Sequence, residues 1–313
     1  MDNRFIPVLV IVGPTASGKT SLSIELAKKY DGEIISADSM QIYKQMNIVS
    51  AKPSKEEMQG IPHYLIDFLD ISKDFSVANY VDMAHPIIKD IYSRGKLPIV
   101  CGGTGLYIDS LIDNIQFQKE IVDESLRNNL NEKAKKLGIE YLLEELKKID
   151  KDSFIKLKND KNQRKVIRAI EIYETTGFTM TEQIKNSRSI PSPYRPTFIG
   201  LDFVNRDILY KRIEKRVDKM IENGLINEAY NIINSDYSKT AIGAIGYKEF
   251  IPYFEKKIVL DDCINRIKIN TRHYAKRQIT WFKRNKQINW ILRENDDSVD
   301  TSLEKCFKIL NSF

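Results

Sequence analysis

The sequence predicts an α/β fold in which a mostly parallel sheet is flanked by helices and carries an all-helical insertion domain. Short β-favouring runs alternate with helical patterns over roughly the first hundred residues, a Lys- and Glu-rich stretch without strand-like runs follows, and an apolar run then returns. Strands that alternate with helices are typical of parallel sheets covered on both faces. The expected organisation is a core of residues 1–122 and 190–313, interrupted by a helical insertion at residues 123–189.

The first part of the chain justifies the sheet. Residues 6–12 form a continuous apolar run that ends at a glycine, which indicates a buried strand, and residues 21–29 then show helical spacing. Further strands are expected at residues 33–37, 97–101 and, more weakly, 63–68. Ser76 is expected to cap a helix that ends near Arg94, with Gly95 as its stop.

The rest of the chain is expected to be mainly helical. Residues 123–185 are dense in Lys and Glu, with apolar residues at helical spacing. Pro191, Pro193 and Pro196 indicate a linker, after which residues 197–201 are expected to return to the sheet. Two basic amphipathic helices are expected at residues 207–222 and 261–283.

Composition excludes several classes of protein. With 42% hydrophobic and 29% charged residues, the 313-residue chain is typical of a globular protein rather than a disordered or fibrous one. No stretch approaches the roughly 18 apolar residues of a membrane helix, and the N-terminal apolar run is too short for a signal peptide. Three widely spaced cysteines favour neither a disulfide framework nor a zinc site. We therefore expect a cytoplasmic protein with no membrane partner.

The excess of positive charge lies mainly in one segment. Between residues 260 and 290 there are eight Lys and Arg residues against two Asp, a difference of +6 that equals the net charge of the whole chain. Such a concentration indicates a polyanionic partner such as a nucleic acid, or else a solvated face of a helix.

A phosphate-binding motif follows the first predicted strand. The motif G-x-x-x-x-G-K-[ST] is matched by Gly13, Pro14, Thr15, Ala16, Ser17, Gly18, Lys19 and Thr20. Its position between a strand and a helix predicts a fold like that of the P-loop NTPases, in which backbone N–H groups and Lys19 bind a pyrophosphate and the Thr20 hydroxyl holds Mg²⁺. The motif recognises phosphates rather than a base, so it does not single out ATP. The alternative is a tight turn with an incidental lysine.

Two further segments are expected at the carboxyl edge of the same sheet, where ligands of α/β proteins bind. Asp38 ends the strand at 33–37, and Thr104 lies in a glycine cluster that follows the strand at 97–101. Asp38 can act on a ligand or merely cap a helix, and the glycines can serve an ordinary turn.

Together these segments resemble the bacterial tRNA dimethylallyltransferase (isopentenyltransferase, or IPP transferase) family over nearly the whole chain. The matching motifs are GPTASGKT from residue 13, ISADSMQIY from 35, AKP from 51, PHYLID from 62, GGTGLY from 102, RAIEIYETTG from 168, RIEKRVDKMIENGL from 212, AIGYKE from 244 and AKRQITWF from 275. The chain departs from the family pattern at Val49 and Ser50, where Gly-Thr is usual, and at Tyr64, where a second histidine is usual.

The resemblance implies transfer of a dimethylallyl group from dimethylallyl pyrophosphate to N6 of the adenosine on the 3′ side of the anticodon in tRNA. It implies that Asp38 and Thr104 are catalytic, that Arg216 joins the phosphate loop around the pyrophosphate, and that Mg²⁺ is the cofactor. The implied tRNA-binding residues are Asp38, Ser39, Met40, Gln41, Thr104, Arg127, Gln163, Arg164, Arg168, Arg272, Lys276 and Arg277. Plain surface charge is the alternative for the insertion residues, and a solvated stripe for Arg212 and Arg216. A monomer is expected.

Two other functions fit parts of the sequence. A P-loop kinase for a small molecule would use the same loop for ATP and Asp38 to activate a hydroxyl. It leaves the cationic segment unexplained. A non-catalytic RNA-binding GTPase or ATPase is the third possibility, and the chain has no NKxD motif for reading guanine.

Overall fold

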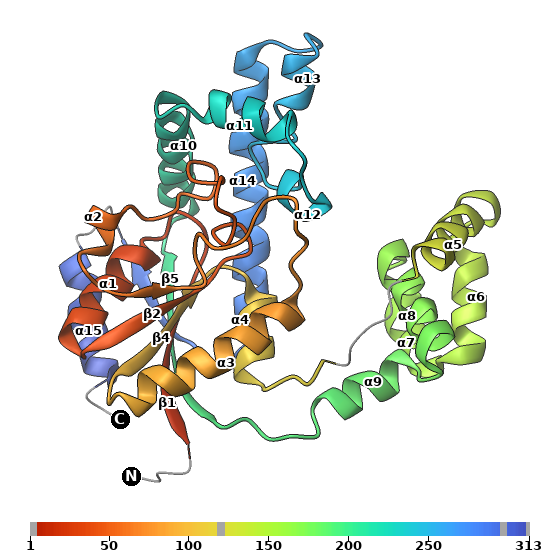
Figure 1. The fold of residues 1–313 in the computed structure, drawn as a ribbon, viewed down its shortest axis with the longest axis horizontal. Coiled ribbons are helices and arrows are strands. Elements are labelled where there is room, and N and C mark those ends of the chain that lie inside the picture. Colours follow the sequence, from red (N-terminus) through yellow and green to blue (C-terminus); the bar gives the residue numbers. More distant parts are fainter. Residues whose placement is uncertain (1–4, 118–122, 295–298, 311–313) are drawn as a thin grey trace. The chain divides into compact units, whose positions relative to one another are not determined.

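The computed structural model of the chain describes residues 5–117, 123–294 and 299–310. The chain divides into two compact units, of which unit 1 comprises residues 1–112 and 193–313 and unit 2 comprises residues 113–192 (Figure 1). Unit 2 is wider at both ends than the insertion expected at residues 123–189. The expected boundary at residue 122 itself lies outside the described residues.

Unit 1 contains a parallel six-stranded sheet, with the strand order β3-β2-β4-β1-β5-β6. The strands are β1 (Ile6–Val12), β2 (Gly32–Ala37), β3 (His63–Tyr64), β4 (Leu97–Gly102), β5 (Tyr194–Phe203) and β6 (Asn289–Arg293). The prediction of a mostly parallel α/β sheet is thereby confirmed.

Helices cover both faces of this sheet, as the alternation of side chains along β1 requires. Val8, Val10 and Val12 belong to one buried cluster, and Leu9 and Ile11 belong to another on the opposite face. The second face packs against α1 (Lys19–Lys29) and α15 (Val299–Leu310). The first packs against α3 (Val77–Ser93), α4 (Gly105–Ile112) and α10 (Arg206–Glu222), and the same apolar cluster continues into α11 (Leu225–Ile233) and α14 (Leu260–Phe282). Burying each Val, Leu or Ile contributes about 2 kcal/mol, which explains why these runs form the core.

The register of the strands brings three loops together. Val12 lies level with Gly102, and Gly102 lies level with Ala37. The residues that follow these strands, which are Gly13, Asp38 and Gly103, therefore begin at the same carboxyl edge.

Beyond this edge, α10, α11 and α14 extend away from the sheet, as Figure 1 shows. Two short helices accompany them, α12 (Lys239–Ile242) and α13 (Ile251–Phe254), whereas α2 (Lys55–Met58) lies in the connection between β2 and β3. Both long basic helices are confirmed. No helix in the described ranges combines the length and apolar character needed to cross a membrane.

Unit 2 is helical throughout its described elements, which confirms the all-helical insertion. They are α5 (Glu124–Leu137), α6 (Ile139–Ile149), α7 (Lys151–Leu157), α8 (Gln163–Thr176) and α9 (Met180–Ser187). The unit has its own apolar core, which includes Leu142, Leu146, Val166 and Ile170.

Some element predictions were wrong. The strand expected at residues 63–68 has only two residues, because Leu65 and Asp67 adopt positive φ angles that interrupt an extended chain. Pro196, interpreted as linker, lies within β5 beside Val8. A proline is accepted there because β6 begins to pair with β5 only at Ile199, so no β6 residue needs the missing N–H group. The strand β6 and the helix α15 were not foreseen.

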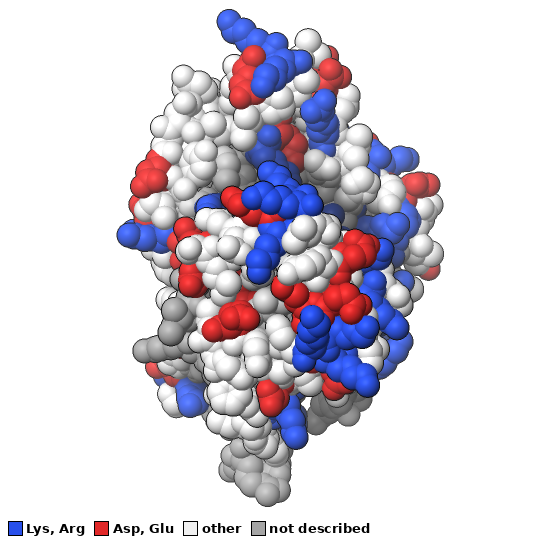
Figure 2. Space-filling view, turned by 90° about the vertical axis from the view of Figure 1, so that its right-hand side faces the viewer, with Lys and Arg blue, Asp and Glu red and all other residues white. Residues whose placement is uncertain are grey.

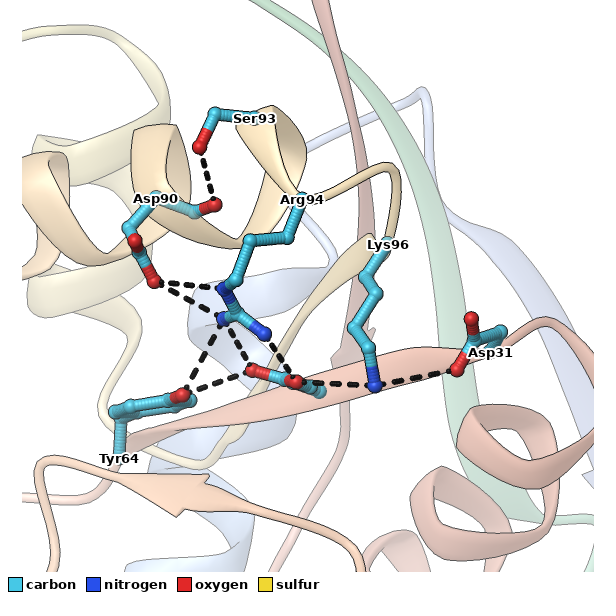
Figure 3. A network of polar contacts seen from close by, with 7 residues as sticks. Asp31, Tyr64, Asp90, Ser93, Arg94 and Lys96 are labelled. Carbon is cyan, nitrogen blue, oxygen red and sulfur yellow. Dashed lines mark hydrogen bonds and ion pairs between the residues drawn. The ribbon is translucent and has the colours of Figure 1, made fainter.

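A buried carboxylate secures the opposite end of β2, as Figure 3 shows. Both oxygens of Glu33 accept hydrogen bonds from the Arg94 guanidinium at 2.6 Å, and Lys96 lies 3.2 Å away. The Tyr64 hydroxyl also donates to Glu33, at 2.8 Å, which gives a structural role to the residue that departs from the family pattern. Arg94 foremost lowers the pKa of Glu33, to about 2.

Candidate active site

A cavity of about 330 Å³ opens at the carboxyl edge of the sheet. Nine of the predicted site residues line it, from the phosphate loop, the segment after β2 and the helices α10 and α14: Thr15, Lys19, Thr20, Asp38, Ser39, Met40, Gln41, Arg216 and Arg277. Its other walls include apolar side chains such as Val49, Val217 and Ile267. The fold thus gathers residues that lie far apart in the sequence around one space with a charged end and apolar walls.

Glycines allow the phosphate loop to adopt its tight path. Gly13 has φ +149°, and a Cβ atom there would lie 2.5 Å from the Leu201 carbonyl oxygen. Gly18 has φ +91° and is the N-cap of α1. The first N–H groups of a helix have no acceptor within that helix, so those at Lys19 and Thr20 can bind an anion.

Among the described residues, four cationic side chains line the cavity, and two of them, Lys19 and Arg216, interact through their charges. Lys19 Nζ donates to the Pro14 carbonyl oxygen at 2.7 Å, which folds the side chain back over the loop. Burial, with the positive charge of Arg216 adding to it, lowers the pKa of Lys19 to about 8. Burial also lowers the pKa of Arg216, while Asp38 opposes that shift. A bound anion would relieve this crowding of positive charge.

Two other arginines donate hydrogen bonds to backbone carbonyl oxygens of the phosphate loop. Arg212 Nε donates to the Ala16 carbonyl oxygen at 2.9 Å, and Arg293 Nη1 donates to the Ser17 carbonyl oxygen at 3.1 Å. Both guanidinium groups lie over the Phe203 ring, at 5.6 and 5.4 Å from its centroid. Arg212 is therefore part of the loop's support and does not belong to a solvated stripe.

Asp38 combines the two functions that the sequence left open. Its Oδ1 atom accepts hydrogen bonds from the N–H groups of Met40, at 2.8 Å, and Gln41, at 3.3 Å. Oδ2 has no hydrogen-bond partner within the described part of the chain and belongs to a residue that lines the cavity. One oxygen thus shapes the turn, and the other is available to a ligand.

Thr104 and Tyr274 complete the polar surroundings of Asp38. Thr104 Oγ1 accepts a hydrogen bond from the Ser39 N–H group at 3.1 Å, which ties the glycine cluster to the Asp38 turn. Tyr274 is partly buried and lines the cavity. Burial first, and then the negative charge of Asp38, raise the pKa of the Tyr274 hydroxyl, so it is a neutral hydrogen-bonding group.

A family model described as IPP transferase matches residues 41–285. The tRNA dimethylallyltransferase of Thermoanaerobacter sp. (strain X514) is 47% identical over 308 residues, which cover 97% of this chain and 98% of the relative. That of Acetivibrio thermocellus is 46% identical over 315 residues, with 100% and 99% covered. The chain belongs to the IPP transferase family.

Solved structures agree with this assignment. The full-length tRNA isopentenylpyrophosphate transferase from Bacillus halodurans superposes with a TM-score of 0.73 at 40% identity, covering 98% of this chain and 96% of that one. A eukaryotic dimethylallyltransferase acting on tRNA gives a TM-score of 0.83 at 31% identity, with 98% and 79% covered. The small-molecule kinase is therefore not favoured for this IPP transferase.

Unit 2 of this IPP transferase carries four of the residues predicted to contact tRNA. Arg127 pairs with the buried carboxylate of Glu171, with N–O distances of 2.6 and 3.2 Å, and Arg168 lies 3.5 Å from the same carboxylate. Gln163 donates to Asn131. Arg164 is exposed and has no polar partner among the residues that the structure describes. Arg127 and Arg168 are thus held in place, whereas Arg164 is free to contact a ligand.

The long helix α14 carries three more of the residues predicted to contact tRNA. Lys276 and Arg277 are exposed and line a second hollow of about 480 Å³ with His273, Thr280, Trp281 and Arg284. Arg272 instead pairs with Glu214 and lies over the Tyr210 ring. Trp281 is only partly buried, and the Arg284 guanidinium lies 3.9 Å from its ring centroid. The predicted cationic stripe is therefore partly neutralised at Arg272.

Figure 2 shows one face of the molecule, on which Lys and Arg side chains alternate with Asp and Glu. No continuous basic surface covers that face.

Three residues that contact predicted site residues or their loops, two in unit 1 and one in unit 2, were not predicted from the sequence. Gln278 contacts two loops in the cavity wall, Arg293 supports the phosphate loop, and Glu171 holds two arginines. The spacing of four between Tyr274 and Gln278 on one helix face was a usable signal. Nothing in the local sequence pointed to Arg293, because its strand had not been recognised.

Proposed function

We propose that the chain transfers the dimethylallyl group of dimethylallyl pyrophosphate to N6 of the adenosine on the 3′ side of the anticodon in tRNA, releasing pyrophosphate. The single observation that carries this proposal is that a carboxylate, Asp38, and two cations, Lys19 and Arg216, line one cavity. Membership of the IPP transferase family supports it.

On this proposal the phosphate loop binds the donor. The N–H groups at the start of α1 and the side chains of Lys19 and Arg216 surround the pyrophosphate, with Gly13, Thr15, Ala16, Ser17 and Gly18 shaping the loop around it. Negative charge grows on the pyrophosphate as the allylic C–O bond breaks. Fixed cations stabilise that developing charge more than they stabilise the ground state.

Asp38 acts on the acceptor. A bond forms between adenine N6 and the allylic carbon, the C–O bond to pyrophosphate breaks with its electron pair leaving on oxygen, and one N6 proton passes to Oδ2 of Asp38. Oδ1 stays bonded to the turn, which keeps the carboxylate in position. Thr104 aligns the Asp38 turn through its bond to the Ser39 N–H group.

Mg²⁺ fits the oxygen-rich end of the cavity. Thr20 offers an exposed hydroxyl there, and no cluster of three or more His, Cys, Asp or Glu side chains within the described ranges forms a separate metal site. Thr20 would therefore hold the ion together with pyrophosphate oxygens and water. When bound, Mg²⁺ supplies positive charge that helps the pyrophosphate to leave.

The target adenosine must leave its stack in the anticodon loop to reach Asp38, so it enters as an extruded base. Ser39, Met40 and Gln41 would contact the base in the cavity, because they line it beside Asp38. Arg127, Gln163, Arg164 and Arg168 of unit 2 would contact the tRNA backbone, and so would Arg272, Lys276 and Arg277 of α14. We expect a monomer that acts in the cytoplasm, where its tRNA substrate is made.

The test uses purified protein, dimethylallyl pyrophosphate labelled in the prenyl group and unmodified tRNA. Transfer of label and release of pyrophosphate should require tRNA and Mg²⁺ and should not require ATP. A tRNA whose target adenosine is replaced by guanosine is the matched control and should accept no label. ATP hydrolysis stimulated by a small hydroxyl compound, without prenylation, would instead establish the kinase.

A further inference from the structure

Gln278 joins the two loops between which the proposed reaction takes place. It lies on α14 and is only 6% exposed. Its Oε1 atom accepts a hydrogen bond from the Thr15 N–H group at 2.8 Å, and its Nε2 atom donates to the Gly103 carbonyl oxygen at 3.0 Å. Thr15 belongs to the phosphate loop, and Gly103 directly precedes Thr104.

A primary amide can make both contacts with one group, which a charged side chain cannot do. Thr15 presents a donor and Gly103 presents an acceptor, so the connecting side chain must accept at one atom and donate at the next. A carboxylate cannot donate, and an ammonium group cannot accept. The fit is also close, because a Cβ atom at Gly103 would lie 2.2 Å from Gln278 Nε2.

Other contacts hold α14 against residues 103–109. The Trp281 indole N–H donates to Asp109 at 2.8 Å, and its ring fills the space where a Cβ atom of Gly105 would lie, at 2.2 Å. The helix therefore has little freedom to slide along residues 103–109. Because Gln278 lies on this helix and bonds to Thr15, it fixes the position of the phosphate loop as well.

We propose that Gln278 is a positioning residue that sets the spacing between the donor and the acceptor. The connection runs from the phosphate loop through Gln278 to Gly103, and from the adjacent Thr104 to the turn that holds Asp38. This inference rests on the proposed function, because it assumes that pyrophosphate binds at the loop and the base at Asp38. Errors of about 1 Å in such a spacing can slow a reaction roughly 10²-fold.

The first test is Gln278→Ala. We expect the single-turnover rate at saturating donor and tRNA to fall about 10- to 100-fold, while the dissociation constants of donor and tRNA change by less than about threefold. A wild-type single-turnover rate at saturating donor and tRNA would overturn the proposal, and so would a loss confined to donor affinity. Failure of the wild-type protein to prenylate tRNA would reject the proposed function instead.

The second test works even if the alanine variant folds poorly. In Gln278→Glu, the protonated acid can accept from Thr15 and donate to Gly103, whereas the ionised form cannot donate. The ratio of variant to wild-type rate at saturating donor should therefore approach one at low pH and fall as pH rises through the titration of the new carboxyl.

Donor affinity is measured at each pH, because an ionised carboxylate also repels pyrophosphate. Gln287→Glu is the matched control, since Gln287 is exposed just beyond α14 and the substitution adds the same charge. Its rate ratio should be independent of pH. A Gln278→Glu ratio that is equally flat would contradict the positioning role.

Discussion

The two oxygens of Asp38 have different surroundings, and this separates its structural contribution from its chemical one. An amide in its place can still accept the hydrogen bonds from Met40 and Gln41, but it is far too weak a base to take the N6 proton. We predict that Asp38→Asn slows single-turnover transfer by at least roughly 10²-fold, with much smaller changes in donor and tRNA affinity. If this variant transferred the prenyl group at a near-normal rate, the only role of Asp38 would be to shape the turn.

Lys19 gives the donor site a dependence on pH. Its pKa is lowered to about 8, so the fraction of charged ammonium falls as pH rises through that value. Pyrophosphate binds the charged form, and donor affinity should therefore be constant below about pH 8 and weaken above it, by up to roughly tenfold per pH unit. Titration calorimetry from pH 6.5 to 9.5 measures this. Lys19→Arg, whose charge persists, should lose the decline, and a decline of equal size would assign it to another group.

The residues predicted from sequence share a property that the missed ones lack. Lys19, Thr20 and Asp38 belong to short motifs whose chemistry is readable because neighbours in the sequence act together. Gln278 acts on Thr15 and Gly103, which are 263 and 175 residues away. Such a pairing depends on the tertiary fold and has no local signature.

The helix α8 presents its cations in two different ways. Arg168 shares the buried Glu171 with Arg127, so its removal would disturb unit 2 itself. Arg164 has no such structural bond among the described residues, which makes it the clearer test of a phosphate contact.

We predict that Arg164→Ala weakens tRNA binding and lowers the slope of log affinity against log salt by about one, while donor affinity and melting temperature stay unchanged. Lys147→Ala is the matched control, because it removes the same charge from α6, where Lys147 pairs with Glu144 at 3.2 Å and lies over the Phe154 ring. Equal salt slopes for Arg164→Ala and wild type would remove Arg164 from the interface.

Helices and strands with clear signals in their own sequence were predicted well, whereas those whose formation depends on neighbouring elements were not. The strand β1 has an uninterrupted apolar run, and α3 has both a capping box at Ser76 and a glycine stop, so their limits were readable. The strand β6 is short, and its sequence has the polar residues Asn289 and Arg293 at its two ends. Its extended form depends on the exposed edge of β5, which the sequence does not reveal.

At the scale of the whole molecule, the Glu33 network should stabilise the sheet without taking part in the reaction. The pKa of Glu33 is about 2 in the folded protein, against 4.5 ordinarily. Its contribution is therefore fully present above about pH 4.5 and is lost as pH falls towards 2. Glu33 stands at the start of β2, at the opposite end from Asp38.

We predict that Glu33→Gln lowers the free energy of unfolding by about 2 kcal/mol at pH 7, the scale of hydrogen bonds to a charged group. Transfer by the folded variant should match wild type. Urea unfolding at pH 7 and near pH 3 provides the measurement, and the difference between the proteins should shrink at the lower pH. A difference that is unchanged between the two pH values would mean that ionisation of Glu33 contributes nothing.

The order of the strands has a consequence for how the chain folds during synthesis. The first four strands to leave the ribosome form the part β3-β2-β4-β1, so β1 ends this partial sheet with an open apolar edge. Its partner β5 follows only after all of unit 2 has been made. Nascent chains therefore pass through a stage in which an aggregation-prone strand awaits its neighbour, and protection of that edge by a chaperone would matter most while unit 2 is being translated.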